Sequence, residues 1–533
     1  MNLIRWAVVL VIAGLVAACT SAGGDGRSDG AVVRTDAGAV RGTVHGGYRS
    51  FQAIPYAAPP VAGLRWRSPQ PVTPWTGVRD VTRAGQRCPQ QASGLSGSPG
   101  GGAEDCLHLS VTSPRSPGAK PVMVWLHASG GGDGSATDAD PHRLAVDGNV
   151  VVVTLNYRLG ILGNFGYPGL AGSGGFGLQD QQAALRWVQR NVAVFGGDPG
   201  NVTLFGYSGG ASAVCAHLAS PPAAGLFHRA IMQSGPCPIS YPAGVPFPGL
   251  SPEVPTIWRS GPEVAAAGAE VAAGLGCADA ATAVACLRRI PAAELTALSQ
   301  VFATPAYGVP VLPEDPVQVL REGRFHRVPV ITGTTRDEMR FFVAALHDLA
   351  GRPVTAQSYS ALLAEVFGPA AGVVAERYPL AAYPTPSLAW ATLLTDRVFA
   401  LAGLQQHRML GAHVPTWAYE FADPDAPPLV FEFPPTLPGG AYHGADLFSV
   451  FDPAGGPEYA GMTAEQRALA DQIVRYWSTF ARTGDPNGPG LPRWTRFEAG
   501  TADVQSLAPG RTGPVDLAEG HQLTFWEGLD RTR

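Results

Sequence analysis

Short, mostly apolar runs recur along this chain, and longer stretches with helical periodicity separate them. Strands that are buried on both faces of a parallel sheet have this near-continuous apolar character, because neither face meets water. The runs are Pro121–His127, Val151–Tyr157, Val202–Phe205, Arg229–Gln233, Val328–Thr332 and Thr416–Phe421. The pattern therefore predicts a fold built around a parallel sheet.

Helical patterns lie between and after these runs. One helix is predicted over Leu178–Ala193, and a second follows Ser208 and must stop before Pro221. A C-terminal helix follows Thr463, which begins a Thr-x-x-Gln capping box, and ends at Gly484. Alternation of strands and helices with right-handed crossovers predicts an α/β sandwich of three layers. We expect a mostly parallel, twisted central sheet, flanked by helices and carrying large loop and helical insertions.

Composition excludes several other classes. Of 533 residues, 45% are apolar and 15% are charged, and the 67 glycines and 49 prolines fall short of the share typical of disordered chains. A disordered chain, a coiled coil and a collagen-like rod are thus excluded. The net charge is −5 and no block of basic residues occurs, so we expect no nucleic-acid partner.

The first residues have the features of a targeting segment. Arg5 supplies a positive charge, and the apolar run Ala7–Ala18 is too short to cross a bilayer as a helix. Small residues precede Cys19 as in a bacterial lipobox. We therefore expect a signal peptide over 1–18, lipidation of Cys19, a flexible tether over 19–30, and one folded domain over 31–533. The protein would be held at the outer face of the cell membrane, or secreted if Cys19 is incidental.

Export favours disulfides among the six remaining cysteines. Cys88 and Cys106 enclose one loop, which contains the low-complexity stretch 92–103 that we interpret as a tethered surface loop. Cys277 and Cys286 enclose a shorter loop. The other two cysteines, Cys215 and Cys237, are either buried thiols or bridge-forming residues, and spacing alone does not pair them. Metal-type cysteine spacing is absent, so no zinc site is predicted.

The sharpest chemical signal is Gly206-Tyr207-Ser208-Gly209-Gly210, which has the form Gly-x-Ser-x-Gly. An apolar run enters the motif and a helical segment leaves it, which is the strand–turn–helix context of a nucleophile elbow. Glycines at both ends let strand and helix approach closely. The motif also arises by chance in glycine-rich chains, but this context favours a catalytic serine.

A serine hydroxyl is a weak nucleophile and needs a base, an acid that orients the base, and donors for an oxyanion. In α/β hydrolases the acid and then the histidine follow the serine along the chain. Asp337 and Glu338 both follow a predicted strand, and these residues alone do not decide between them. The candidate histidines are His347, His407, His413, His443 and His521.

Longer motifs help to choose among these acids and histidines. Phe195–Gly210 contains Phe-Gly-Gly, four further residues and VTLFGYSGG, and Glu104–Val111 reads EDCLHLSV. On these motifs the chain resembles the type-B carboxylesterase/cholinesterase-like family of α/β hydrolases, from about Val32 to Trp526. Supporting matches are Asn156–Arg158, Gly225–Ala230, Gln233–Gly235 and Thr483–Asn487.

The resemblance implies an α/β-hydrolase fold with Ser208 as nucleophile, Glu338 as acid and His443 as base. It implies that Ser234 is a hydrogen-bonding group that supports them. It also implies two disulfides, Cys88–Cys106 and Cys277–Cys286, and no cofactor or metal.

The expected oxyanion hole departs from the family pattern. Relatives carry His/Tyr-Gly-Gly-Gly after the corresponding strand, whereas this chain has His127-Ala128-Ser129-Gly130-Gly131-Gly132. Distance from the strand assigns the backbone N–H groups of Ser129 and Gly130, together with that of Gly209. The alternative is a shift of register to the glycines that follow, and one missing donor would cost about 10²–10³ in rate.

Other departures concern the substrate. Tyr207 replaces the glutamate frequent in the family, and the loop between Cys88 and Cys106 has no tryptophan. A choline ester is therefore disfavoured, because quaternary ammonium groups are recognised by aromatic faces. Asp446 replaces a second frequent glutamate and either tunes the site or favours a helix N-terminus.

The sequence thus predicts a serine carboxylesterase that hydrolyses a small-molecule ester through an acyl-enzyme, and that meets the membrane only through its lipid anchor. One alternative is a non-catalytic, surface-anchored binding protein on the same scaffold. Another is an amidase or carbamate hydrolase with the same triad. The sequence specifies neither the natural substrate nor an oligomeric state.

Overall fold

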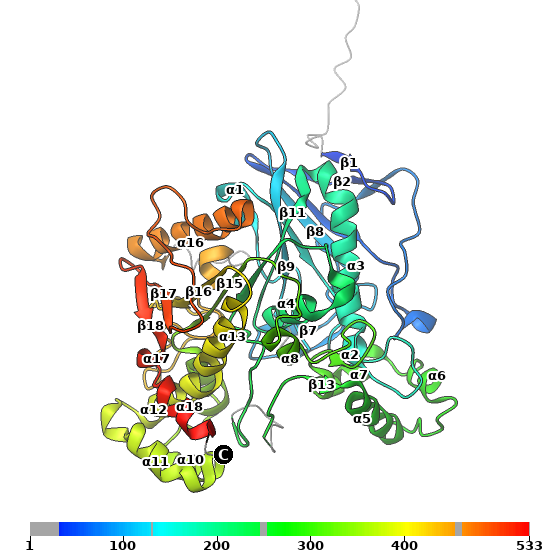
Figure 1. Cartoon of the computed structure of the whole chain (residues 1–533). Helices are drawn as coiled ribbons and strands as arrows, with labels where there is room; N and C mark the ends of the chain where they lie inside the picture. Colours follow the sequence, from blue (N-terminus) through cyan, green and yellow to red (C-terminus); the bar gives the residue numbers. More distant parts are fainter. Residues whose placement is uncertain (1–30, 129–131, 246–252, 453–460, 532–533) are drawn as a thin grey trace, which may run out of the picture.

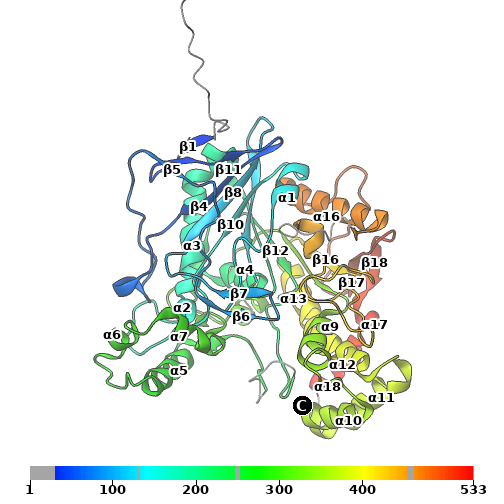
Figure 2. The same cartoon turned by 180° about the vertical axis from the view of Figure 1, so that it is seen from behind.

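A computed structural model describes residues 31–128, 132–245, 253–452 and 461–531. Within these residues an 11-stranded sheet forms the centre of the molecule (Figures 1 and 2). Its strands, in spatial order, are β18 (Gly513–Asp516), β17 (Asp503–Leu507), β16 (Thr416–Phe421), β15 (Val330–Thr335), β12 (Arg229–Gln233), β11 (Gly197–Tyr207), β9 (Lys120–Leu126), β10 (Val151–Leu155), β8 (His108–Pro114), β4 (Tyr48–Pro55) and β3 (Thr43–Val44).

The middle of this sheet is parallel. Neighbouring strands from β17 to β10 pair in parallel, whereas β18, β8, β4 and β3 add antiparallel pairs at the two edges. Each of the six apolar runs predicted as strands lies within or overlaps one of the parallel strands, so the predicted parallel core is confirmed. Small strands outside it are β1 (Val32–Arg34), β2 (Ala39–Arg41), β5 (Val78–Asp80), β13 (Arg259–Ser260) and β14 (Ala306–Tyr307).

Helices cover both faces of the sheet. Because side chains alternate along a strand, Met123 and Trp125 of β9 pack into one core cluster, and Val122 and Val124 pack into the other. The longer helices are α3 (Phe176–Asn191), α4 (Gly209–Ala219), α5 (Gly261–Gly274), α10 (Ala356–Phe367), α12 (Pro386–Leu394), α13 (Leu401–Gly411), α16 (Ala464–Thr483) and α18 (Leu523–Arg531). The shorter ones are α1 (His142–Asp147), α2 (Gly160–Asn164), α6 (Ala283–Leu287), α7 (Ala292–Leu295), α8 (Pro316–Arg321), α9 (Glu338–Val343), α11 (Ala371–Arg377), α14 (Leu447–Val450) and α17 (Leu517–Gly520). This arrangement confirms the three-layer prediction.

The C-terminal half contributes a helical insertion at one end of the sheet, where α10, α11, α12, α17 and α18 gather (Figures 1 and 2). Its central helix runs from Pro386 to Gly411 through α12, the π-helical segment η8 (Thr395–Ala400) and α13. By length and composition this helix and Ala356–Arg377 are each apolar enough to cross a membrane, but 89% of the former's apolar window is buried inside the protein. It is therefore a core helix.

Several local predictions have clear outcomes. Thr463 and Gln466 form the predicted capping box of α16, and Gly484 ends the helix in the left-handed conformation. The stretch predicted as a surface loop between Cys88 and Cys106 instead contains a hairpin, β6 (Gln90–Ser93) with β7 (Ser98–Gly101). Within 92–103 only Ser98 is buried and the Cys88–Cys106 bridge closes the stretch, so the tethered surface position is confirmed, whereas the hairpin was not predicted.

Three disulfides are present in the described residues. The structure joins Cys88 to Cys106 and Cys277 to Cys286, the two pairs that the family resemblance implies. It also joins Cys215 of α4 to Cys237, which follows β12, and both of these sulfur-bearing residues are fully buried. The third bridge settles the question that spacing left open.

A buried ion pair ties the parallel sheet to α3. Arg158, which follows β10, donates through Nε and Nη2 to the two carboxylate oxygens of Asp180, each over 2.7 Å. Both side chains are almost wholly excluded from solvent. Removing one partner of such a pair leaves the other charge buried and uncompensated.

We therefore expect Asp180→Asn to lower the free energy of unfolding by about 3–5 kcal/mol, as measured by urea denaturation. The matched control is Asp36→Asn, which breaks the exposed pair between Asp36 and Arg190 and should cost less than about 1 kcal/mol. Equal losses in the two variants would contradict this assignment.

Candidate active site

Ser208 lies at a sharp turn between β11 and α4. Its backbone has φ 54° and ψ −123°, a conformation that non-glycine residues adopt only when the surrounding structure imposes it. The Ser208 N–H donates to the carbonyl of Gln233 in β12 over 2.8 Å, which holds the turn against the neighbouring strand. Ser208 is partly exposed, although Tyr207 and Gly210 beside it in the motif are buried. The hydroxyl is thus presented at the end of the strand, as the nucleophile-elbow motif predicts.

The flanking glycines are required by close packing. A Cβ added to Gly206 would lie 2.5 Å from the carbonyl carbon of Gly210, and one added to Gly210 would lie 2.1 Å from the carbonyl oxygen of Leu126. Both gaps are far below van der Waals contact. Strand β11, helix α4 and the end of β9 can therefore meet at this point only because neither residue has a side chain.

His443 and Glu338 complete a chain of hydrogen bonds that begins at Ser208. The Nε2 atom of His443 lies 3.0 Å from the Ser208 Oγ, and its Nδ1 atom lies 2.5 Å from Glu338 Oε2. The other carboxylate oxygen, Oε1, accepts the backbone N–H of Thr335 over 2.9 Å. Glu338 is fully buried and His443 nearly so. A hydroxyl, an imidazole and a buried carboxylate in this order can activate the hydroxyl as a nucleophile.

The structure also separates the candidates that sequence reasoning left open. Asp337 turns away from His443: it forms an ion pair with Arg340 over 2.7 Å and accepts the backbone N–H of Ala441. Among the candidate histidines, His407 is buried, and none of its interactions in the described residues reaches Ser208. His521 lies between two other carboxylates. The histidine at Ser208 is therefore His443.

Aromatic rings enclose His443. The ring centroids of Tyr207, Phe342 and Phe399 lie 4.9, 5.0 and 5.2 Å from that of the imidazole. Burial, together with the nearby carboxylates of Glu338 and Asp446, raises the pKa of the Tyr207 phenol well above its usual value, so Tyr207 is neutral. Sequence reasoning identified Tyr207 but not the two phenylalanines, because nothing in their local pattern distinguishes them from core residues.

Asp446 is buried beside the site. Its Oδ2 accepts hydrogen bonds from Gln233 Nε2 over 2.9 Å and from the Tyr419 hydroxyl over 2.8 Å. The aspartate precedes α14 but its side chain does not cap that helix. Burial raises the pKa of Asp446. Of the two interpretations offered by the sequence, the structure therefore favours a carboxyl that belongs to the site.

Ser234 is also buried here, at φ 51°, and its N–H donates to the carbonyl of Gly333 over 2.9 Å. Its hydroxyl has no hydrogen-bond partner among the residues that the structure describes. The supporting hydrogen bond that the sequence predicts for Ser234 is therefore not observed among the described residues.

Of the three expected oxyanion donors, the structure describes only Gly209. Ser129 and Gly130 lie outside the described residues. Gly209 is the first residue of α4, so its N–H has no acceptor within the helix and is available at the site. No group of three or more side chains suited to hold a metal occurs in the described part of the chain.

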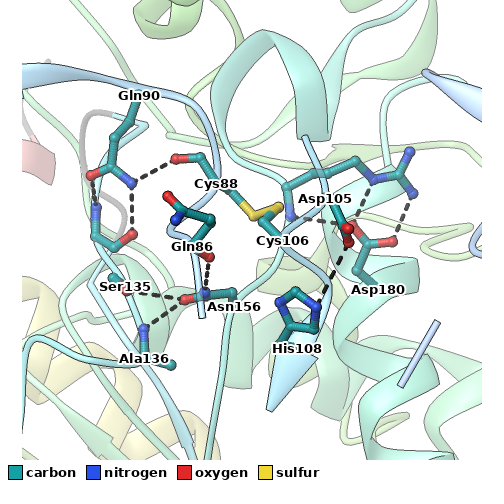
Figure 3. The surroundings of a disulfide bond; sticks show 12 residues. Gln86, Cys88, Gln90, Asp105, Cys106, His108, Ser135, Ala136, Asn156 and Asp180 are labelled. Carbon is teal, nitrogen blue, oxygen red and sulfur yellow. Dashed lines mark hydrogen bonds and ion pairs between the residues drawn. A yellow bond between two sulfur atoms is a disulfide. The ribbon is translucent and has the colours of Figure 1, made fainter. Parts of the chain in front are cut away.

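The loop that follows β9, on which further oxyanion donors are expected, is anchored at Gly134 and Ala136, beside the Cys88–Cys106 bridge (Figure 3). Gln90 donates to the Gly134 carbonyl and accepts the Gly134 N–H, each over 2.9 Å. Asn156 accepts the N–H of Ala136 over 2.7 Å. The disulfide therefore braces residues that hold the loop following β9, on which the remaining donors are expected.

Comparison with known proteins agrees with this geometry. The family model described as "Carboxylesterase family" matches residues 29–526. A para-nitrobenzyl esterase of Bacillus subtilis is 34% identical over 89% of this chain and 94% of its own length. A pyrethroid hydrolase of Rattus norvegicus is 33% identical over 99% of this chain and 93% of its own. A cocaine esterase of Oryctolagus cuniculus is 33% identical over 92% and 94%, respectively.

Solved structures give the same result. A thermophilic PNB esterase superposes with a TM-score of 0.76 at 31% identity, covering 93% of this chain and 99% of that one. A further PNB esterase gives a TM-score of 0.73 at 30% identity over the same shares. The chain therefore belongs to the carboxylesterase family, has the α/β-hydrolase fold, and is a carboxylic-ester hydrolase.

Proposed function

We propose that Ser208, His443 and Glu338 are the catalytic triad of this esterase. Ser208 Oγ attacks the ester carbonyl carbon while His443 Nε2 takes the hydroxyl proton. Glu338 accepts a hydrogen bond from the Nδ1–H of His443. This bond fixes the tautomer of the imidazole, and the carboxylate stabilises the imidazolium that forms. His443 then gives its proton to the departing alcohol, and water releases the acid from Ser208 by the same route. The observation that carries this proposal is the unbroken series of hydrogen bonds from the Ser208 hydroxyl to the Thr335 N–H.

Backbone N–H groups would hold the negative charge that develops on the carbonyl oxygen. Gly209 supplies one donor from the start of α4, where the helix dipole adds to its effect. We propose Ser129 and Gly130 for the others. The substitution of Ala128 and Ser129 for the usual glycines need not remove donors, because the N–H group is common to all three residue types.

Ser208→Ala should lower kcat by about 10⁴–10⁶ on p-nitrophenyl butyrate, because no other group takes over the nucleophile's role. Mass spectrometry after organophosphate labelling should place the modification on the Ser208 peptide of the wild-type chain. Full activity in the variant, or a label elsewhere, would refute the assignment.

Glu338→Gln tests the acid. The Thr335 N–H would keep the amide oxygen, which turns the amide NH₂ toward His443 Nδ1. The imidazole would then carry its proton on Nε2 and could no longer accept one from Ser208, so kcat should fall by about 10⁴. Asp337→Asn is the control and should lose far less, because Asp337 contacts Arg340 instead of His443. A larger loss of kcat in Asp337→Asn than in Glu338→Gln would identify Asp337 as the acid.

We propose that the substrates are uncharged esters with an apolar or aromatic group. The site has aromatic side chains around His443 and a neutral Tyr207 beside the nucleophile. Relatives named for pyrethroids and para-nitrobenzyl esters support this substrate class.

The expected result is a higher kcat/KM for p-nitrobenzyl acetate than for acetylcholine, because Tyr207, at the position of the glutamate frequent in the family, is neutral and does not offset a quaternary ammonium charge. Tyr207→Glu should reduce the ratio of the two kcat/KM values, because it restores a negative charge next to the nucleophile. Faster hydrolysis of the choline ester by the wild type would overturn this proposal, and matched anilides measured in parallel would detect amidase activity.

We also propose that the protein is exported and lipidated at Cys19. The apolar run before small residues and cysteine supports the anchor, and the buried Cys215–Cys237 bridge is consistent with an oxidising compartment. Metabolic labelling with palmitate should mark the wild-type protein, and Cys19→Ala should abolish the label. Persistence of the label in that variant would exclude Cys19 as its site.

A further inference from the structure

Another buried histidine, His521, lies between two carboxylates, away from Ser208. The Nδ1 atom of His521 lies 2.6 Å from Asp396 Oδ1, and its Nε2 lies 2.6 Å from Glu420 Oε1. The Tyr378 hydroxyl donates to the other oxygen of Asp396 over 2.8 Å, and Trp526 Nε1 donates to that hydroxyl over 2.8 Å. We call Asp396, His521 and Glu420 the ionic cluster.

The geometry of the ionic cluster favours a charged imidazole. Both ring nitrogens face carboxylate oxygens, and only the imidazolium can donate from both. Burial lowers the pKa of His521, but Asp396 and Glu420 outweigh burial and raise it to about 10. Tyr378 and Tyr383 also lie near Asp396 in the described part of the chain, and both are neutral because burial and the aspartate raise their pKa values.

Buried charges of this kind are expensive to desolvate and contribute little net stability compared with apolar packing. The ionic cluster is therefore better explained by the elements that it holds together than by a general gain in stability.

Asp396 belongs to η8, and this segment contacts His443 and the residue that follows Glu338. The Thr395 hydroxyl accepts the N–H of Met339, the residue directly after Glu338, over 3.0 Å. One turn further along, the Phe399 ring lies 5.2 Å from His443 and 6.2 Å from Phe342 of α9. A π-helical turn inside a longer helix is uncommon and is frequently found at functional sites.

Glu420 belongs to β16. This strand pairs with β15, and β15 in turn holds Glu338 through the backbone of Thr335. Glu420 is the register partner of Thr334 in β15. The next residue, Thr335, donates its N–H to Glu338 Oε1. Asp396 thus lies on the segment that holds Met339, Glu420 lies on the strand next to β15, and His521 is the bridge between them.

We infer that His521 is a positioning residue for the esterase reaction: by joining η8 to β16 it fixes the distance between Glu338 and His443. It makes no contact with Ser208 among the described residues and is not a catalytic residue. This inference rests on the proposed roles of Glu338 and His443.

The first test replaces the bridge. His521→Gln should lower kcat on p-nitrophenyl butyrate by up to about 100-fold, because small displacements of a catalytic group cost that much, while KM changes little. His521→Lys restores a cation between the carboxylates and should recover part of kcat. His217→Gln is the matched control, since His217 is equally buried but bonds to Gln181 in α3, and its kcat should remain at the wild-type value.

A second variant serves if His521→Gln does not fold. Thr395→Val keeps the side chain's shape but removes the acceptor for the Met339 N–H, so kcat should fall with little change in KM. The double variant should lose less than the two single losses combined, because both changes act through η8. The proton shared by His443 and Glu338, read by ¹H NMR, should shift in both single variants.

Unchanged kcat and an unchanged proton resonance in folded His521→Gln or Thr395→Val would overturn the inference. So would a loss in His217→Gln as large as that in His521→Gln. The proposed triad is tested separately: if Glu338→Gln is inactive while His521→Gln and Thr395→Val are fully active, only the positioning role fails. If Glu338→Gln keeps full activity, the triad assignment itself fails.

Discussion

The active site depends on one constrained turn of backbone. Ser208 adopts a positive φ that its own side chain disfavours, and the surrounding structure must supply the energy that holds it there. That energy comes from close contact of β11, α4 and β9 at two glycines and from the hydrogen bond to Gln233. This turn brings Ser208 Oγ within 3.0 Å of His443 Nε2, and the rest of the proposed triad is arranged relative to it.

Much of this arrangement follows from the sequence. The apolar runs identify the parallel strands, because strands buried on both faces have no polar side. The Gly-x-Ser-x-Gly motif identifies the turn, because each glycine answers a contact that would exclude a Cβ. The choice of Glu338 over Asp337 came only from the family resemblance, since two adjacent acids after one strand look alike until their directions are known.

Other features were beyond the sequence for physical reasons. Cys215 and Cys237 come together because α4 and the segment after β12 pack against each other, and spacing along the chain does not encode that contact. Phe342 and Phe399 enclose His443 from two elements far apart in the sequence. The ionic cluster joins His521 to carboxylates 125 and 101 positions earlier in the chain, so no local pattern announces it.

The Cys215–Cys237 bond links the helix that starts at the nucleophile to the segment just beyond Ser234. Thiols remain reduced in most cytosols, whereas they oxidise in the bacterial periplasm and the endoplasmic reticulum. Enzyme produced in these two kinds of host would consequently differ by a covalent crosslink on the helix that begins at the proposed nucleophile. The choice of expression compartment therefore decides which of two chemical species is purified, and activities measured on one do not automatically describe the other.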